Sequence, residues 1–319
     1  MRLANIIWMV VAVMGGSYCL AGGNLIPSFK DALTKGASAR VRLCVQDERG
    51  VPIKNANIRA TLANREADYS MHGLTDTNGV YVVSGNTTGD YLQFLVSKAG
   101  YYDSWEKVSY IEMGKEHEVV NGKWQPFEAN LIIVLRRVQN PTALKIGNGN
   151  FVLTKQLNYW LGFDIQKHDF VRPHGTGEVT DFEVKIDWNG KWYPDYTGMG
   201  IELRFSTPYS GFYKLPVNPA SKFKGPYSAD AEKAFCQKAA FDEQVVNPTQ
   251  RIRHPFDENK CWVVRSRCKV DEMGKLISAN YSVIYKISFC GKYDGKGGVR
   301  ITGFFNPTPN DTNLEPGGK

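Results

Sequence analysis

The 319-residue sequence has no internal apolar run of the roughly 18 residues that a membrane-spanning helix needs, which excludes a protein with several membrane spans. It also lacks the His-Glu-x-x-His zinc motif, the Gly-x-Ser-x-Gly nucleophile elbow and the phosphate loop ending in Gly-Lys-Ser/Thr. None of its five histidines belongs to a His-x-x-Glu pair. These absences exclude common zinc-peptidase, hydrolase and nucleotide-binding arrangements, and the sequence predicts no cofactor and no metal.

The composition is that of a folded chain. Apolar residues make up 42% and aromatic residues 12%, which excludes global disorder. The sequence has 39 Lys and Arg against 32 Asp and Glu, a formal net charge of +7. A chain of this length predicts about two domains.

Residues 1–21 have the pattern of a secretory signal peptide. Arg2 gives the positive start, residues 6–14 form the apolar core, and Cys19 and Ala21 occupy positions −3 and −1 of the expected cleavage site. We therefore expect export, to a secreted, periplasmic or cell-surface location, with no transmembrane anchor after cleavage.

The mature chain keeps five cysteines, and export permits disulfides. Cys44 stands alone in the first half, while Cys236, Cys261, Cys268 and Cys290 cluster in the second. We predict one or two disulfides among these four, with the pairing left open and at least one thiol unpaired or joined to another molecule. Cys261 and Cys268 are seven positions apart and would lie on opposite faces of a single strand, so a bridge between them would need a break in that strand.

Residues 38–138 predict a β-sandwich built from short strands and turns. Val41, Leu43 and Val45 alternate with polar residues, as in a half-buried strand. The run Asp76-Thr77-Asn78-Gly79 predicts a hairpin turn, because Asn-Gly tolerates the positive φ that tight turns need. The continuous apolar run 131–135 predicts a strand that is buried on both faces.

Three motifs follow one another in this unit: Asp47-x-x-Gly50, Thr75-Asp76-x-x-Gly79 and Gly100-Tyr101. With them, residues 38–110 resemble the carboxypeptidase regulatory-like (transthyretin-like) β-sandwich family. The resemblance implies a non-catalytic module in an extracytoplasmic setting. Such modules accompany peptidases, glycan-active enzymes, receptors and adhesins, so the resemblance implies a fold and no reaction.

Residues 139–319 predict a second antiparallel β-rich unit with one helix. Apolar residues alternate with polar ones in 182–188, 201–205 and 281–289, which indicates strands with one buried face, and Trp188 is expected in the core. The fold class is therefore mainly β, with a transthyretin-like sandwich followed by a second β-rich unit.

The helix is predicted after Ser228, a suitable N-cap, because Ala231, Ala234, Phe235 and Ala239 would share one face. The tail 306–319 is rich in Pro and Gly and is expected to fray. Stretches at Asn140-Pro141, 162–164, 172–177 and 305–315 resemble a recurring C-terminal region of uncharacterised secreted bacterial proteins. This second resemblance implies that the two units occur together.

Arg265, Arg267 and Lys269 recur at period two and would form a basic ribbon if their strand is exposed. Residues 139–319 contain 24 basic and 19 acidic residues, whereas 38–138 contain 12 of each. We expect an acidic polysaccharide or an anionic cell-surface component as partner, and no nucleic acid, because the chain is exported. A solvated sheet face is the alternative.

Trp192, Tyr193 and Tyr196 lie in a stretch with Gly, Asn, Lys and Asp that has the character of a sugar-binding surface. Packing in the core is the alternative for these three rings. Asp164 and Asp181 could form the carboxylate pair of a glycan hydrolase, if the fold brings them together.

The sequence favours an exported, non-enzymatic binding or scaffolding protein with a glycan as its ligand. Two alternatives stay open: a carboxylate-dependent glycan hydrolase acting through residues 160–200, and a structural surface or adhesion component that self-associates through exposed edge strands. The oligomeric state stays open as well.

Overall fold

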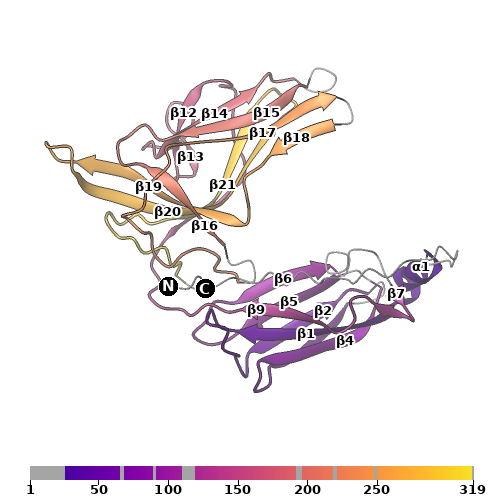
Figure 1. The fold of residues 1–319 in the computed structure, drawn as a ribbon. Coiled ribbons are helices and arrows are strands. Elements are labelled where there is room, and N and C mark those ends of the chain that lie inside the picture. The colour runs from indigo at the N-terminus through magenta and orange to yellow at the C-terminus, as the bar shows by residue number, and fades with distance from the viewer. Residues whose placement is uncertain are drawn as a thin grey trace, which may run out of the picture.

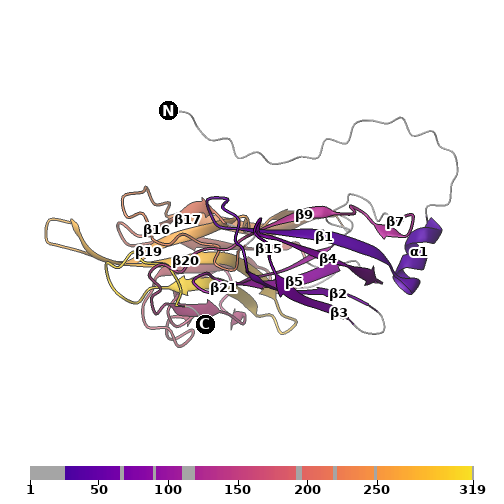
Figure 2. The ribbon, with the colours of Figure 1, turned by 90° about the horizontal axis from the view of Figure 1, so that it is seen from below.

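The structure is a computed structural model that describes residues 26–64, 68–88, 91–109, 119–191, 196–217, 221–247 and 250–317. The predicted signal peptide, residues 1–21, lies outside the described residues. Two β-sandwiches follow one another along the chain (Figure 1). Helix α1 (Ile26–Lys35) lies at the end of the first sandwich that is far from the second one (Figures 1 and 2). No helix in the described ranges is long and apolar enough to cross a membrane.

The first sandwich contains two sheets, which we call the β1 sheet and the β2 sheet. The β1 sheet has the order β4-β1-β8-β7, with β9 parallel to β1. Its strands are β1 (Ala37–Gln46), β4 (Val80–Thr87), β7 (Val119–Val120), β8 (Lys123–Trp124) and β9 (Ala129–Val134). The β2 sheet has the antiparallel order β3-β2-β5-β6. Its strands are β2 (Asn57–Leu62), β3 (Tyr69–Leu74), β5 (Tyr91–Ser97) and β6 (Ser104–Ser109).

The core of the first sandwich lies between the inward faces of these two sheets. The predicted alternation in β1 is confirmed, since Val41, Leu43 and Val45 are at most 1% exposed. The run 131–135 is only half buried: Ile133 is 1% exposed, but its neighbour Ile132 is 58% exposed, because β9 pairs with β1 and turns one face to solvent. The prediction of burial on both faces is therefore wrong.

The turn at Asp76 forms, but its two flanking strands enter different sheets instead of pairing as a hairpin. Asp76 Oδ1 accepts hydrogen bonds from the amides of Asn78 (2.9 Å) and Val80 (2.8 Å). Gly79 has a φ of 72°, and a Cβ on it would lie 2.4 Å from the carbonyl oxygen of Val45. Turn chemistry is thus local, whereas the partner of each strand is set by the sandwich.

The second sandwich also contains two sheets, which we call the β14 sheet and the β20 sheet. The β14 sheet has the order β13-β12-β14-β15-β17-β18. Its strands are β12 (Trp160–Asp164), β13 (Asp169–Phe170), β14 (Phe182–Trp188), β15 (Gly198–Arg204), β17 (Lys238–Asn247) and β18 (Gln250–His254). The β20 sheet has the order β10-β21-β20-β19-β16, with β11 also pairing with β21. Its strands are β10 (Lys145–Asn148), β11 (Val152–Thr154), β16 (Gly211–Pro216), β19 (Lys260–Val270), β20 (Leu276–Gly291) and β21 (Gly297–Phe305).

The main core of the second sandwich lies between these sheets, and the predicted alternation in 182–188 is confirmed. Trp188 is 2% exposed, as expected of a core residue. A smaller core covers the other face of the β20 sheet, where Val263, Val283 and Leu314 are fully buried. Strands β19 and β20 are therefore buried on both faces, because the chain returns over the sheet near its C-terminus.

The predicted helix after Ser228 is wrong. This segment forms turns and isolated bridges: Ser228 pairs with Asn313, and Cys236 pairs with Phe212. The amide of Asp230 donates to the hydroxyl of Tyr213 (2.7 Å). Packing on the β20 sheet therefore overrides the helical spacing of the alanines.

Candidate functional site: the groove between the two sandwiches

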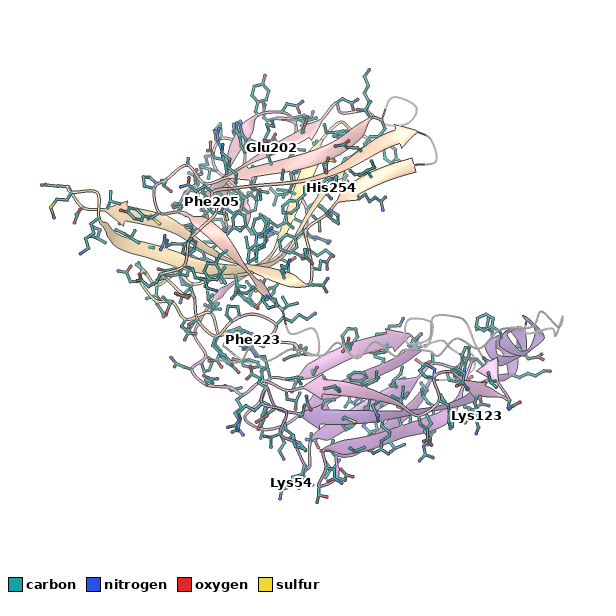
Figure 3. The ribbon with its side chains drawn as sticks, viewed as in Figure 1. Lys54, Lys123, Glu202, Phe205, Phe223 and His254 are labelled. Atoms are coloured by element: carbon teal, nitrogen blue, oxygen red, sulfur yellow. The ribbon has the colours of Figure 1, made fainter. Side chains whose placement is uncertain are left out.

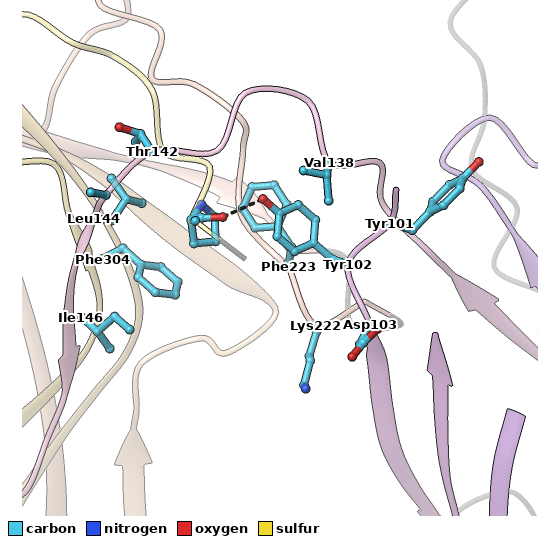
Figure 4. A pocket seen from close by; sticks show the side chains of 13 residues that line it. Tyr101, Tyr102, Asp103, Val138, Thr142, Leu144, Ile146, Lys222, Phe223 and Phe304 are labelled. Carbon is cyan, nitrogen blue, oxygen red and sulfur yellow. Dashed lines mark hydrogen bonds between the residues drawn. The ribbon is translucent and has the colours of Figure 1, made fainter. Parts of the chain in front are cut away.

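A cavity of about 420 Å³ lies where the two sandwiches meet, and we call it the junction groove (Figure 4). One wall is the segment Tyr101–Asp103, which leads into β6 of the first sandwich. The opposite wall comes from β10 and β21 of the second sandwich, and the linking chain and residues near the C-terminus complete the lining. Because ligand sites favour domain interfaces and hollows of this size, the junction groove is the candidate functional site.

The groove is apolar at one end and charged at the other. Leu144, Ile146 and Phe304 form the apolar end, and Ile146 is 64% exposed despite its apolar side chain. Asp103 and Lys222 lie near one another at the other end (Figure 4). Apolar surfaces flanked by a few polar groups are typical of sites that bind organic ligands.

Two aromatic rings lie between these ends. The rings of Tyr102 and Phe223 are tilted toward each other with their centroids 5.0 Å apart. Phe223 is 3% exposed and lies where the two sandwiches meet (Figure 3). The ring of Tyr101 turns away from the other lining side chains (Figure 4). The groove therefore has an aromatic centre that its two walls share.

Glu315 is a buried residue, 1% exposed, that hydrogen-bonds to Tyr102 in one wall and to the linking chain; we call such a buried contact between distant segments a tie. Its carboxylate accepts hydrogen bonds from the amides of Gln139 (2.7 Å) and Asn140 (2.6 Å). The Tyr102 hydroxyl lies 2.9 Å from the same carboxylate and 2.7 Å from the carbonyl oxygen of Pro316. Burial, reinforced by the Glu315 carboxylate, raises the pKa of Tyr102, so that its hydroxyl remains a donor.

Arg136 makes a second tie between the sandwiches and is 6% exposed. Its guanidinium lies against both the Phe223 ring and the Tyr227 ring, 4.2 Å from each centroid. It donates to the Glu48 carboxylate (2.7 Å) and to the carbonyl oxygens of Phe223 (3.1 Å) and Gly225. The buried, hydrogen-bonded charges hold the walls of the groove in one arrangement.

Tyr227 completes this tie. Its hydroxyl lies 2.8 Å from the Glu48 carboxylate and 2.7 Å from the carbonyl oxygen of Arg137. Burial and the hydrogen bond to Glu48 raise the pKa of Tyr227 to about 12. The phenol therefore stays protonated at neutral pH and keeps donating.

Sequence reasoning missed this groove. The prediction that the tail 306–319 frays is wrong for its described part, because Asn306 and Glu315 are 1% exposed and Leu314 is fully buried. In the sequence, the stretch 305–315 is distinguished only by a resemblance. Its closely spaced Asn, Asp and Glu residues could have indicated an ordered segment, since in the structure they hydrogen-bond to one another.

The predicted aromatic site can be placed only in part. Trp192 and Tyr193 lie outside the described residues. Tyr196 is half-buried, packs against the core of the second sandwich, and donates its hydroxyl to Glu243 (3.2 Å). This contact fits the alternative of core packing for Tyr196.

The predicted basic ribbon does not form, because its strand is not exposed. Arg265 is 8% exposed, donates to the carbonyl oxygens of Tyr209 (2.7 Å) and Ala231 (2.9 Å), and covers the ring of Phe235. Arg267 has a φ of 53°, within a register shift of β19, and its side chain is only 18% exposed. Lys269 alone of the three predicted residues is exposed.

Arg267 instead brings together the two carboxylates proposed for a hydrolase. Its guanidinium donates to Asp164 (2.8 Å) and to both oxygens of Asp181 (2.9 and 3.0 Å). Asp181 also accepts from the Ser266 hydroxyl (2.6 Å) and from the Ile165 amide (2.8 Å). The side chain of Asp181 is fully buried and that of Asp164 is 2% exposed.

The remaining contacts of Asp164 are backbone amides. Although burial opposes its ionisation, hydrogen bonds from the amides of Glu178, Lys167 and Val179 lower the pKa of Asp164. Every carboxylate oxygen of Asp164 and Asp181 thus accepts hydrogen bonds within the protein. We assign these two residues to a buried ion cluster, not to a hydrolytic pair.

The histidines of 168–174 do not meet at one site. The ring nitrogens of His168 are buried and have no hydrogen-bond partner among the described residues, and its ring lies edge-on to Phe163. The carboxylate of Asp169 accepts hydrogen bonds from the hydroxyl and amide of Thr176, not from a histidine. His174 is exposed. No group of three potential metal ligands occurs within the described ranges.

The five cysteines within the described residues are free thiols, so none of the disulfides predicted among Cys236, Cys261, Cys268 and Cys290 forms. Cys261 and Cys268 are seven positions apart in β19, about 20 Å in an extended strand, which is too far for a bridge. Burial raises the pKa of Cys261 to about 11, so this thiol is protonated.

No family model and no curated protein matches the sequence. Among solved structures, similar chains include 3-chlorocatechol 1,2-dioxygenase from Rhodococcus opacus 1CP, with 15% identity, a TM-score of 0.25, and coverage of 32% of this chain and 61% of that one. Catechol 1,2-dioxygenase from Acinetobacter radioresistens has 15% identity, a TM-score of 0.26, and coverage of 34% and 55%. Hydroxyquinol 1,2-dioxygenase from Pseudomonas putida DLL-E4 has 12% identity, a TM-score of 0.25, and coverage of 33% and 58%. This chain thus spans less than two thirds of each enzyme, and a likeness this weak assigns it neither a fold nor an activity.

Proposed function

We propose that this chain is an exported, non-enzymatic binding protein that holds a short stretch of carbohydrate chain in the junction groove. The first sandwich would be a carboxypeptidase regulatory-like module that supplies one wall. The second sandwich supplies the other wall, so that the site exists only when both are in place.

The observation that carries this proposal is the composition of the groove. The ring of Tyr102 and the apolar side chains of Ile146 and Phe304 offer faces for the C–H surfaces of a sugar. Asp103 and Lys222 offer an acceptor and a donor to sugar hydroxyls at the charged end. The buried ties at Glu315 and Arg136 hold these groups in position before a ligand arrives, which limits the entropy lost on binding.

The test is a glycan array followed by titration calorimetry with the best-bound oligosaccharide. Ile146→Ser and Lys222→Ala change exposed groove side chains without touching the buried ties. We expect each to weaken binding by about fivefold, since exposed contacts contribute up to about 1 kcal/mol.

Matched controls come from the first sandwich, away from the groove. Ile132→Ser changes an exposed isoleucine on the β1 sheet, and Lys54→Ala changes an exposed loop lysine (Figure 3). Both should bind like the unchanged protein. The proposal fails if no glycan binds at millimolar concentration, or if groove and control variants bind equally well.

A further inference from the structure

Among the described residues, the outer face of the β2 sheet carries basic side chains and no acidic ones. Side chains of β2 and β5 alternate between the sandwich core and solvent, and the strand register places alternate side chains of β3 and β6 on the same outward side. We call the outward-facing described residues of these four strands the β2-sheet face. Arg59 and Lys107 contribute positive charge to it, and none of its residues is Asp or Glu.

A single row of side chains crosses all four strands of this face. The strand register places Trp105 opposite Leu95, Leu95 opposite Arg59, and Arg59 opposite His72. Neighbouring strands are about 4.8 Å apart, so the row spans about 14 Å. Trp105 is 51% exposed. The row is therefore apolar at one end and basic at the other.

Within the part of the chain that the structure describes, no side chain pairs with the basic end of the row. Arg59 and His72 have no hydrogen-bond or ion-pair partner among the residues that the structure describes. Both line a surface hollow of about 430 Å³, together with Asn57 and Leu74. Lys107 is different, because its ammonium lies 3.7 Å from the centroid of the Tyr91 ring.

We propose that the β2-sheet face binds an acidic polysaccharide. A sugar ring would lie on Trp105 and Leu95, and a carboxylate or sulfate of the chain would accept hydrogen bonds from Arg59 and His72. The absence of acidic side chains from the face makes its charge complementary to such a ligand. This surface lies outside the junction groove, and binding to it does not require the groove.

An anionic polysaccharide fits this face better than an anionic membrane does. Trp105 and Leu95 are cross-strand neighbours, but Leu74, the other aliphatic residue of the face, is separated from them by polar side chains such as Arg59 and Asn57. Insertion into a bilayer interface needs a continuous apolar surface, whereas a row of one ring and two basic groups suits a linear, charged chain.

The test compares two forms of one polymer. The full chain without its signal peptide is titrated with polygalacturonate and with its methyl ester, which has the same backbone without the charge. Alginate and heparin serve as further acidic probes, and anionic phospholipid vesicles serve as the membrane probe. We expect binding to polygalacturonate, at least tenfold weaker binding to the ester, and weaker binding as salt rises from roughly 0.05 to 0.5 M.

The variants assign the binding to named side chains. Arg59→Ala should weaken polygalacturonate binding about fivefold, and Trp105→Ala about tenfold. Arg42→Ala removes an exposed arginine from the opposite face of the same sandwich, and Tyr159→Ala removes a 66% exposed ring from the second one. Both controls should bind like the unchanged protein.

Several outcomes would overturn the inference. They are no binding to any of the three acidic polymers, equal binding of the methyl ester, binding to vesicles alone, and unchanged affinity in both Arg59→Ala and Trp105→Ala. Lys222→Ala separates the two proposals. A loss confined to that variant places binding in the junction groove, and a loss confined to Arg59→Ala and Trp105→Ala places it on the β2-sheet face.

Discussion

Arg267 in the second sandwich and Arg59 in the first have similar sequence surroundings, since each lies in a strand whose side chains alternate between two faces. Arg267 donates to two buried aspartates and to Gln166, and its side chain is 18% exposed. Arg59 is exposed and has no partner among the described residues. Partners and burial, not strand spacing, therefore separate an arginine that stabilises the fold from one that is exposed to solvent.

The same contrast holds for two tryptophans on outer sheet faces. On the β14 sheet, Arg204 covers the Trp160 ring at 4.2 Å and also forms a bidentate pair with Glu183. On the β2 sheet, Trp105 is 51% exposed and has Leu95 as its cross-strand neighbour. On the β14 sheet the charged side chains pair with one another, whereas on the β2 sheet Arg59 is exposed to solvent.

The largest effect is expected at the Arg267 cluster. Asp181→Asn removes one of the two charges that neutralise a buried guanidinium, so we expect a loss of about 3–5 kcal/mol in the free energy of unfolding. Urea unfolding followed by circular dichroism measures it. Asp187→Asn, on an exposed side chain of the same sandwich, is the control. Equal stability of the two variants would show that the cluster contributes no more than a surface charge.

A smaller effect is expected at the junction. Two backbone amides donate to the Glu315 carboxylate, and Glu315→Gln replaces that carboxylate with a neutral side-chain amide. Loss of the charged hydrogen bonds should lower the free energy of unfolding by about 1.5–3 kcal/mol. Glu128→Gln is the control, because that residue forms an exposed pair with Arg40. A junction variant as stable as its control would contradict the role of Glu315 as a tie.

A buried group without a partner should respond to pH. Burial lowers the pKa of His168 below its ordinary value of 6.5, although Asp169 opposes the shift. Below pH 6.5 the unfolded chain therefore binds a proton that the folded protein does not, and the free energy of unfolding falls as pH falls. Urea unfolding at about pH 7.5 and 5.5 should show a smaller fall in His168→Asn, a substitution that suits the local φ of 55°.

The control for the pH measurement is His174→Asn, since His174 is exposed. That variant should keep the pH dependence of the unchanged protein. If His168→Asn loses as much stability between the two pH values as this control, then His168 does not link folding to pH.

The smallest effect is expected on the β2-sheet face itself. Arg59→Ala should change the free energy of unfolding by less than about 0.5 kcal/mol, since the side chain has no polar partner among the described residues. Arg204→Ala on the β14 sheet should lose more stability, because its ion pair with Glu183 and its contact with the Trp160 ring are lost. Thermal unfolding of both variants tests the contrast, and a larger loss in Arg59→Ala would reverse it.

The strands and turns could be predicted because their signals are local. Alternation in 182–188 and around Val41 is imposed by a side-chain period of two and one buried face. The turn at Asp76 follows from a carboxylate that accepts nearby amides and from a glycine at positive φ. These features need no knowledge of distant residues.

The errors all concern contacts between distant residues. The alanines after Ser228 fit one helix face, yet the segment packs on the β20 sheet as turns. The prediction of a basic ribbon required one exposed face of β19. A register shift near Arg267 and the smaller core packed on β19 leave no such face. The junction groove joins residues about two hundred positions apart, such as Tyr102 and Glu315, so no local pattern could reveal it.

The β class of this protein, its two successive strand-rich units and its main turns could be predicted from the sequence, because backbone periodicity and turn chemistry act over a few residues. The sequence could not show which charged side chains are buried and paired, as at Arg267 and Glu315, and which are exposed, as at Arg59. The pairing of a charge depends on which distant strands and loops the fold brings within hydrogen-bonding distance.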